Sequence, residues 1–180
     1  METSTSAAGE IVVVTAVGQD GPGVIAALAR AVYDLGGNLD DATMTRLHGA
    51  FAAMVAARMP EGVGEDAVRV ALAPVARDRG LTVTVQTVSD APAEAAPDTL
   101  LTVYGADRPG IVTQVAEALA ARGVNITDMD TRVAGAPESP VYVMLLEVVG
   151  GELDLSADLD ALKRALGVDI TVSILDTEAL

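Results

Sequence analysis

A short loop that occurs twice constrains the fold of this chain more than any other feature. Its copies span Asp20–Val24 (DGPGV) and Asp107–Ile111 (DRPGI), and each residue of the second copy follows its counterpart by 87 positions. Each copy comes after an apolar run rich in β-branched residues and before apolar residues at helical spacing. The repeat therefore predicts two similar strand–loop–helix corners, one in each half of the chain.

The repeat extends well beyond the loop. It includes the apolar face of the following helix, the glycine at the expected helix end and the asparagine that opens the next strand. The matching pairs, each 87 positions apart, are Val24 and Ile111, Ile25 and Val112, Leu28 and Val115, Val32 and Leu119, Gly36 and Gly123, and Asn38 and Asn125. A register this long predicts a duplicated domain.

Both halves predict the same order of elements. Strands are expected at Ile11–Val17, Asn38–Arg46, Phe51–Met59 and Leu81–Val88, and again at Leu100–Tyr104, Asn125–Val133, Val141–Val149 and Asp169–Leu175. One helix follows each loop. In the first half, a second helix is expected to begin near Glu65, and Pro74 inside it should kink or divide it. In the second half, the second helix is expected to begin near Ser156, a candidate cap. Pro137 and Pro140 are expected in a loop. Each half is therefore βαββαβ, and two helices on one face of such a four-stranded antiparallel sheet form the ferredoxin-like arrangement of an α+β protein.

The two halves are expected to be separate domains, residues 10–88 and 99–177. Between them, residues 89–98 contain two prolines among alanines and acidic residues, a composition that favours an exposed linker. Residues 1–9 are polar, are expected to be disordered and lack the pattern of a signal peptide. No apolar run approaches the ~18 residues of a membrane span. We therefore expect a cytoplasmic protein that does not enter a membrane.

The composition narrows the function. With 26 acidic and 11 basic residues the net charge is −15, and the resulting field repels phosphate backbones, so direct binding of nucleic acid is not expected. The chain has no cysteine, and its single histidine, His48, is expected in a solvent-facing turn. Few groups are left that could act as nucleophile or base near neutral pH, and no residues have metal-ligand spacing. We expect neither an enzyme nor a bound metal or cofactor.

The combined motifs carry a resemblance to a known family. An Asp-x-Pro-Gly-[Ile/Val] corner followed by Gly-x-Asn-[Ile/Leu], at Gly36–Leu39 and Gly123–Ile126, resembles the ACT domain, a small-molecule-sensing regulatory module. Two such units, spanning Ile11 to Leu175, are similar to the glycine cleavage system transcriptional repressor family of free-standing tandem ACT proteins. The resemblance implies an amino-acid ligand, with glycine as the family-implied guess, bound at ACT interfaces. It also implies action through a protein partner in transcriptional regulation of glycine cleavage.

The chemistry of the corner agrees with such a ligand. A helix N-terminus offers unpaired N–H groups and a partial positive charge, which suit a carboxylate, and glycine lets a ligand approach the backbone closely. The aspartates can accept a hydrogen bond from an α-ammonium group, and the asparagines of the adjacent strand start supply a donor and an acceptor. The candidate ligand-binding residues are Asp20, Gly21, Gly23, Val24, Asn38 and Leu39 in the first half, and Asp107, Arg108, Gly110, Ile111, Asn125 and Ile126 in the second.

Simpler interpretations stay open for several of these residues. Each aspartate could cap its helix, and each asparagine could end the preceding one. Arg108, which replaces Gly21 in the second copy, could pair with a ligand carboxylate or an acidic partner, or reach into solvent. Val124 likewise replaces Gly37. Because the copies differ at these positions, one site is expected to be stronger than the other or the only working one.

Three classes of function remain. The favoured one is an amino-acid-binding regulatory protein that acts on a regulator protein or an enzyme partner. The second is a ligand-free structural or dimerisation module. The third, with least support, is an enzyme or the regulatory subunit of an enzyme of amino-acid metabolism. The second strand of each unit, expected at a sheet edge, offers a way to form a homodimer or to join the two sheets.

Overall fold

The computed structural model describes residues 9–88, 95–136, 139–150 and 155–175. They form two compact units, Met1–Pro92 and Ala93–Leu180, which are called unit 1 and unit 2 below. Most of the expected disordered N-terminus, linker residues 89–94 and Pro137 lie outside the described residues.

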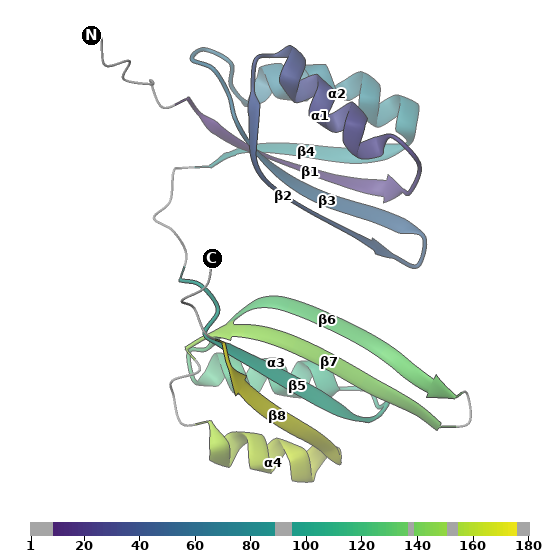
Figure 1. The fold of residues 1–180 in the computed structure, drawn as a ribbon, viewed down its shortest axis with the longest axis vertical. Helices are drawn as coiled ribbons and strands as arrows, with labels where there is room; N and C mark the ends of the chain where they lie inside the picture. The colour runs from purple at the N-terminus through teal and green to yellow at the C-terminus, as the bar shows by residue number, and fades with distance from the viewer. Residues whose placement is uncertain (1–8, 89–94, 137–138, 151–154, 176–180) are drawn as a thin grey trace. The chain divides into compact units, whose positions relative to one another are not determined.

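Unit 1 is a four-stranded antiparallel sheet with two helices on one face (Figure 1). Its elements are β1 (Ile11–Gln19), α1 (Val24–Asp34), β2 (Asn38–Leu47), β3 (Ala50–Arg58), α2 (Glu65–Arg79) and β4 (Leu81–Val88). The strand order is β2-β3-β1-β4, so β2 and β4 are the sheet edges. The predicted ferredoxin-like order of elements and the edge position of the second strand are confirmed.

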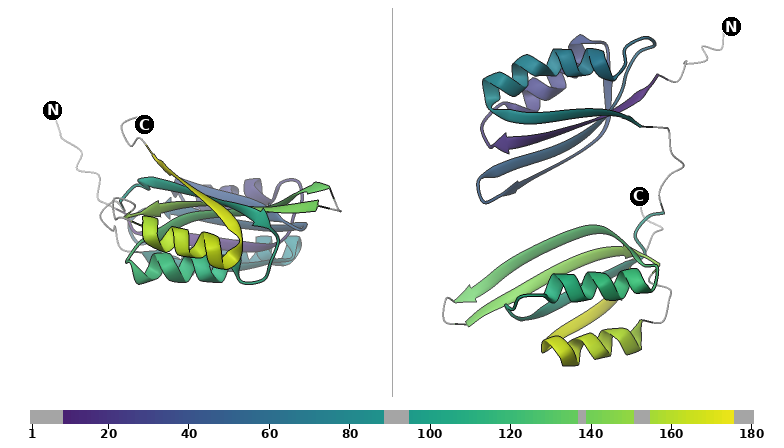
Figure 2. Two further views of the ribbon diagram at one scale, coloured as in Figure 1. Left: turned by 90° about the horizontal axis from the view of Figure 1, so that it is seen from below. Right: turned by 180° about the vertical axis from the view of Figure 1, so that it is seen from behind.

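Unit 2 repeats this arrangement. Its elements are β5 (Thr99–Ala106), α3 (Ile111–Ala121), β6 (Asn125–Ala136), β7 (Ser139–Val149), α4 (Ser156–Leu166) and β8 (Val168–Ile174). The strand order is β6-β7-β5-β8, and α3 and α4 lie on the same face of the sheet (Figure 2). The β6–β7 hairpin is longer than β2–β3, so residues of β7 match residues of β3 at an offset of 91 instead of 87, as the pairs Asn38–Arg58 and Asn125–Val149 show.

Each unit has an aliphatic core between the sheet and its helices. Alternate residues of the central strands point into it, such as Val12, Val14 and Ala16 in β1, whereas their neighbours point to the uncovered face of the sheet. One aromatic ring per unit lies opposite a glycine of the central strand. Phe51 pairs with Gly18, and Tyr142 pairs with Gly105. The core of each unit is thus packed under the repeated corner by equivalent residues.

Three details differ from the sequence prediction. α2 is not divided: it runs through Pro74, because Pro74 and Val70 are exposed and water can reach the Val70 carbonyl that loses its helical donor. Pro140 lies in β7, paired with Gly135 beyond the end of β5, and not in a loop. α4 begins at Ser156 itself, and Leu155 takes the N-cap position.

Candidate functional site

The repeated corner places a glycine at the start of a helix in both units. Gly23 and Gly110 are the N-cap residues of α1 and α3 and have φ angles of 84° and 94°, in the left-handed region. Within the described part of the chain, no side chain caps either helix. The interpretation of the aspartates as helix caps is therefore wrong. The first N–H groups of both helices face the corner without a side-chain acceptor.

Gly23→Ala should lower the free energy of unfolding by about 1–2 kcal/mol, because an L residue pays that much in the left-handed region. The new Cβ would also lie 3.2 Å from Nη2 of Arg79. Gly21→Ala is the matched control: among the described residues nothing lies within 4 Å of a Cβ there. Urea denaturation of both variants checks the difference, and equal losses would contradict a conformational requirement for glycine at position 23.

Two arginines from other elements surround the unit 1 corner. Arg46 of β2 forms an ion pair with Asp20, with 3.2 Å between Nη1 and Oδ2. Arg79, at the end of α2, donates from Nη1 to the Pro22 carbonyl oxygen at 2.8 Å. The backbone N–H of Asp20 donates to the Gly49 carbonyl oxygen of the β2–β3 turn at 3.4 Å. The corner therefore combines an uncapped helix start with two guanidinium groups, neither of which the sequence analysis identified.

The unit 2 corner is also joined to its second helix by an arginine hydrogen bond, but there the arginine belongs to the corner and not to the helix. Arg108, the counterpart of Gly21, donates to the carbonyl oxygen of Leu166, the counterpart of Arg79, at 3.5 Å. In both units an arginine thus joins the corner to the C-terminal end of the second helix, where a cation is favourable. The Gly21/Arg108 difference corresponds to this exchange, and Arg108 itself is exposed.

The corners differ in charge. Val133 occupies the position of Arg46 in unit 2, so Asp107 has no equivalent of that ion pair. Tyr142, whose ring replaces Phe51, has a hydroxyl near Asp107. Burial raises the pKa of this hydroxyl, a hydrogen bond with Thr131 partly offsets the rise, and the charge of Asp107 adds to it. Unit 1 therefore presents the more cationic corner.

A second exchange explains the other difference between the copies. In unit 1, Gly37 leaves room for the buried side chain of Met59, whose Sδ would lie 2.6 Å from a Cβ at position 37. In unit 2 the sizes are reversed: Val124 is buried, and Gly150 takes the place of Met59. The Gly37/Val124 difference is therefore a packing compensation and gives no information about which unit binds a ligand more tightly.

Asn38 and Asn125 do not lie next to the corner of their own unit. The expectation that the start of the second strand is adjacent to the corner is therefore wrong. Asn38 pairs with Arg58, which also pairs with Ile11, at the end of the sheet where β1 begins. Asp20 follows the last residue of β1, roughly 30 Å away at the rise of a β-strand. The cause is the helix, which carries the chain back along the sheet. Asn125 is placed in the same way in unit 2.

The other candidates are available to a ligand to different degrees. The side chains of Val24 and Ile111 are buried, so only their backbone could meet one. Leu39 and Ile126 pack against the cores. Asn38 is exposed and donates to Asp40, at 3.2 Å from Nδ2 to Oδ1. Neither asparagine ends a helix, because Gly36 and Gly123 take the left-handed position after the helices.

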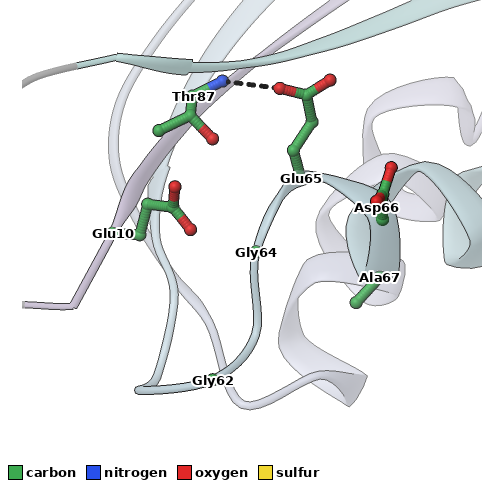
Figure 3. A pocket seen from close by; sticks show the side chains of 7 residues that line it. All are labelled: Glu10, Gly62, Gly64, Glu65, Asp66, Ala67 and Thr87. Atoms are coloured by element: carbon green, nitrogen blue, oxygen red, sulfur yellow. Dashed lines mark hydrogen bonds between the residues drawn. The ribbon is translucent and has the colours of Figure 1, made fainter.

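An acidic pocket of about 570 Å³ lies at the start of α2, with Glu10, Glu65 and Thr87 around it (Figure 3). Glu65 accepts the backbone N–H of Thr87 at 3.1 Å and pairs with Arg69, which also holds Asp66 at 2.5 Å. The carboxylates of Glu65 and Asp66 are therefore already paired with Arg69. In the part of the chain that the structure describes, no group of His, Asp or Glu side chains could hold a metal ion, and the pocket contains none of the candidate residues.

Comparison with known families assigns both units. The ACT domain family matches residues 10–86 and, independently, residues 99–167. The chain is a tandem ACT-domain protein. ACT domains are regulatory modules that bind small ligands, often amino acids. Among the described residues, no helix is long and apolar enough to cross a membrane.

Solved structures share the tandem ACT fold. An unknown protein from Galdieria sulphuraria is 24% identical, with a TM-score of 0.81 over 93% of this chain and 99% of the other. A candidate glycine cleavage system transcriptional repressor is 19% identical, with a TM-score of 0.71 over 93% and 98% of the two chains. Both show the likeness of fold alone. No curated protein matches this chain in sequence.

Proposed function

We propose that this protein is a cytoplasmic amino-acid-sensing regulator that binds a small amino acid where ACT units meet. The observation that carries the proposal is the duplicated corner, in which a left-handed glycine opens a helix that no described side chain caps. The first N–H groups of such a helix attract a carboxylate. Asp20 and Asp107 offer acceptors for an ammonium group at the same corners. Together they suit the two charges of an amino acid.

The ligand site is completed by a second unit. Within one unit, corner and asparagine lie at opposite ends of the sheet. If the exposed edges of two β2 strands pair antiparallel, the end of one β2 meets the start of the other. Arg46, near the end of β2, already contacts Asp20. Such pairing therefore brings the corner of one unit toward Asn38 of the other. We propose a homodimer in which like units pair along these edges.

The sensor acts through a protein partner and has no catalytic activity of its own. A net charge of −15 opposes direct contact with DNA. A regulator protein is therefore the proposed route to any effect on transcription. The likeness to a candidate glycine cleavage system transcriptional repressor suggests glycine as the first ligand to test and glycine cleavage as the regulated process.

A calorimetric or thermal-shift screen of all proteinogenic amino acids tests the proposal. A ligand present at about 100 times its Kd should add roughly 2.7 kcal/mol to the free energy of unfolding. We expect such stabilisation with glycine or another small amino acid. If no amino acid stabilises the protein, the ACT tandem is a structural or dimerisation module instead.

Variants show whether the stabilisation comes from the corners. Asn125→Ala and Gly110→Val should reduce it by the contribution of the Asp107 corner, and Gly110→Val also disturbs the helix start. Asn38→Ala should do the same for the Asp20 corner. Glu117→Ala, an exposed change on α3, is the control and should leave the response unchanged. Full stabilisation in all three corner and asparagine variants would place the ligand elsewhere.

A further inference from the structure

The first helix of each unit differs from the second in the charges at its start. α2 begins with Glu65 and Asp66, and α4 has Asp158 in its first turn. In α1 and α3 the first turn contains no acidic residue. The positive end of the helix dipole is therefore balanced by the helix's own carboxylates in α2 and α4, but not in α1 and α3.

In unit 1 two arginines add to this positive end. Arg79 donates from Nη1 to the Pro22 carbonyl oxygen, and its Nη2 would lie 3.2 Å from a Cβ at Gly23, the N-cap residue of α1. Arg46 contacts Asp20 through Nη1 and is 69% exposed. A guanidinium group has five N–H donors, and these contacts use the Nη1 of each. Both arginines therefore retain donors for a ligand carboxylate.

In unit 2 a neutral group takes the place of Arg79 at the helix start. A Cβ at Gly110 would lie 3.4 Å from Nε2 of Gln114, and among the described residues no arginine atom would lie within 4 Å of it. The counterpart of Gln114 in unit 1 is alanine. The guanidinium of Arg108 lies toward the end of α4, where its Nη1 would be 3.3 Å from a Cβ at Gly167. The start of α3 therefore offers a ligand carboxylate an uncharged amide donor.

The second cation of the unit 1 corner is also replaced in unit 2. Val133 occupies the position of Arg46, so Asp107 has no equivalent of the ion pair between Arg46 and Asp20. In unit 1 two guanidinium groups and one carboxylate thus surround the helix start. In unit 2 the groups at the same positions are an amide, a valine side chain and a carboxylate. The two corners therefore differ in the sign of the charge that they present to a ligand.

This difference selects ligands by charge, if amino acids bind at the corners as proposed above. The α-carboxylate and the ammonium group of any amino acid meet the helix start and the aspartate. A dicarboxylic amino acid has a second carboxylate, which Arg46 can bind in unit 1, whereas in unit 2 it would face Asp107 without a cation. We propose that the Asp20 corner selects a dicarboxylic amino acid, aspartate or glutamate, and that the Asp107 corner selects an amino acid with an uncharged side chain.

Isothermal calorimetry with matched ligands tests this selectivity. Free aspartate and asparagine, like glutamate and glutamine, have nearly the same shape and differ by one charge. Asp107→Ala with Asn125→Ala isolates the Asp20 corner, and Asp20→Ala with Asn38→Ala isolates the Asp107 corner. The isolated Asp20 corner should bind at least one of the two acids about tenfold tighter than its amide, the low end for a charge-assisted hydrogen bond. The isolated Asp107 corner should bind glycine or an amide tighter than either acid.

Arg46→Gln tests the cause of the selectivity. In the isolated Asp20 corner it should abolish the preference for the acid, while the amide still binds. Arg30→Gln is the matched control, because it removes the same charge from an exposed arginine of α1 that pairs with Asp34. It should leave the preference unchanged.

The outcomes separate this inference from the proposed function. Equal affinities for acid and amide at the isolated Asp20 corner would overturn the selectivity and leave amino-acid binding in place. An unchanged preference in Arg46→Gln would overturn the assignment to Arg46. If neither isolated corner binds any of these amino acids, the proposed function is rejected, and the selectivity with it.

Discussion

Gly37→Val should lower the free energy of unfolding of unit 1 by about 1–3 kcal/mol in the wild type, the usual cost of overpacking a core. In a Met59→Ala background it should cost less. The Cβ added at position 37 would lie 2.6 Å from Sδ and 2.8 Å from Cε of Met59, both of which Met59→Ala removes. It would also lie 2.9 Å from Cγ1 of Val32, which remains and has to shift. Unit 2 already contains this combination, since Val124 is buried where Gly150 faces it.

The experiment is a double-mutant cycle in differential scanning calorimetry. Met59→Ala alone should cost about 2–5 kcal/mol, because it empties a buried methionine site. We expect the double variant to be more stable than the sum of the single losses by on the order of 0.5–3 kcal/mol. The transition of unit 2 serves as an internal control and should not move. Additive losses would mean that Gly37 and Met59 do not compensate each other.

The sequence predicted the fold well because its signals are local and duplicated. β-branched runs, apolar residues at helical spacing and glycines after helices depend on neighbours a few positions apart. The left-handed φ angles of Gly36 and Gly123 confirm the expected helix ends. The turn at His48 is confirmed too, since both His48 and Gly49 have positive φ, as in a tight hairpin.

The site was harder to predict because its residues are far apart in the sequence and are brought together only by the fold. Arg79 and Pro22 are 57 positions apart, and only the packing of α2 beside the corner brings them together. One signal was present in the sequence. At the 87-residue offset, Gly21 corresponds to Arg108 and Arg79 corresponds to Leu166, so the arginine moves from one position of the pair to the other. The exchange between Met59 and Gly150 was hidden because the longer β6–β7 hairpin changes the offset to 91.

The separation of corner and asparagine could have been derived from the order of elements. In a β-α-β unit with antiparallel neighbours, the helix returns the chain to the end of the sheet where the first strand began. Asn38 must then start β2 far from Asp20, as the pairing of Asn38 with Arg58 shows. For this reason a single ACT unit cannot join both groups around one amino acid, and the site proposed above draws on two units.

A mixture of two binding-defective chains should recover ligand binding. Asp20→Ala removes the corner acceptor, and Asn38→Ala removes the group that the other unit supplies. Both chains also carry Asp107→Ala and Asn125→Ala, so that only unit 1 sites are counted. Each chain alone should bind nothing. After subunit exchange, half of the symmetric dimers are mixed and have one intact site of two, so about a quarter of the unit 1 sites should return.

Isothermal calorimetry with the amino acid that stabilises the protein most measures this recovery. The variants are suited to it because Asn38 is exposed and Asp20 pairs only at the surface, with Arg46 69% exposed, so both chains should fold. Recovery requires that one site draws on two chains, since a site built within one chain stays defective in every mixture. Mixed dimers without binding would therefore reject the shared site, while retention of binding by either chain alone would remove that residue from the ligand contacts.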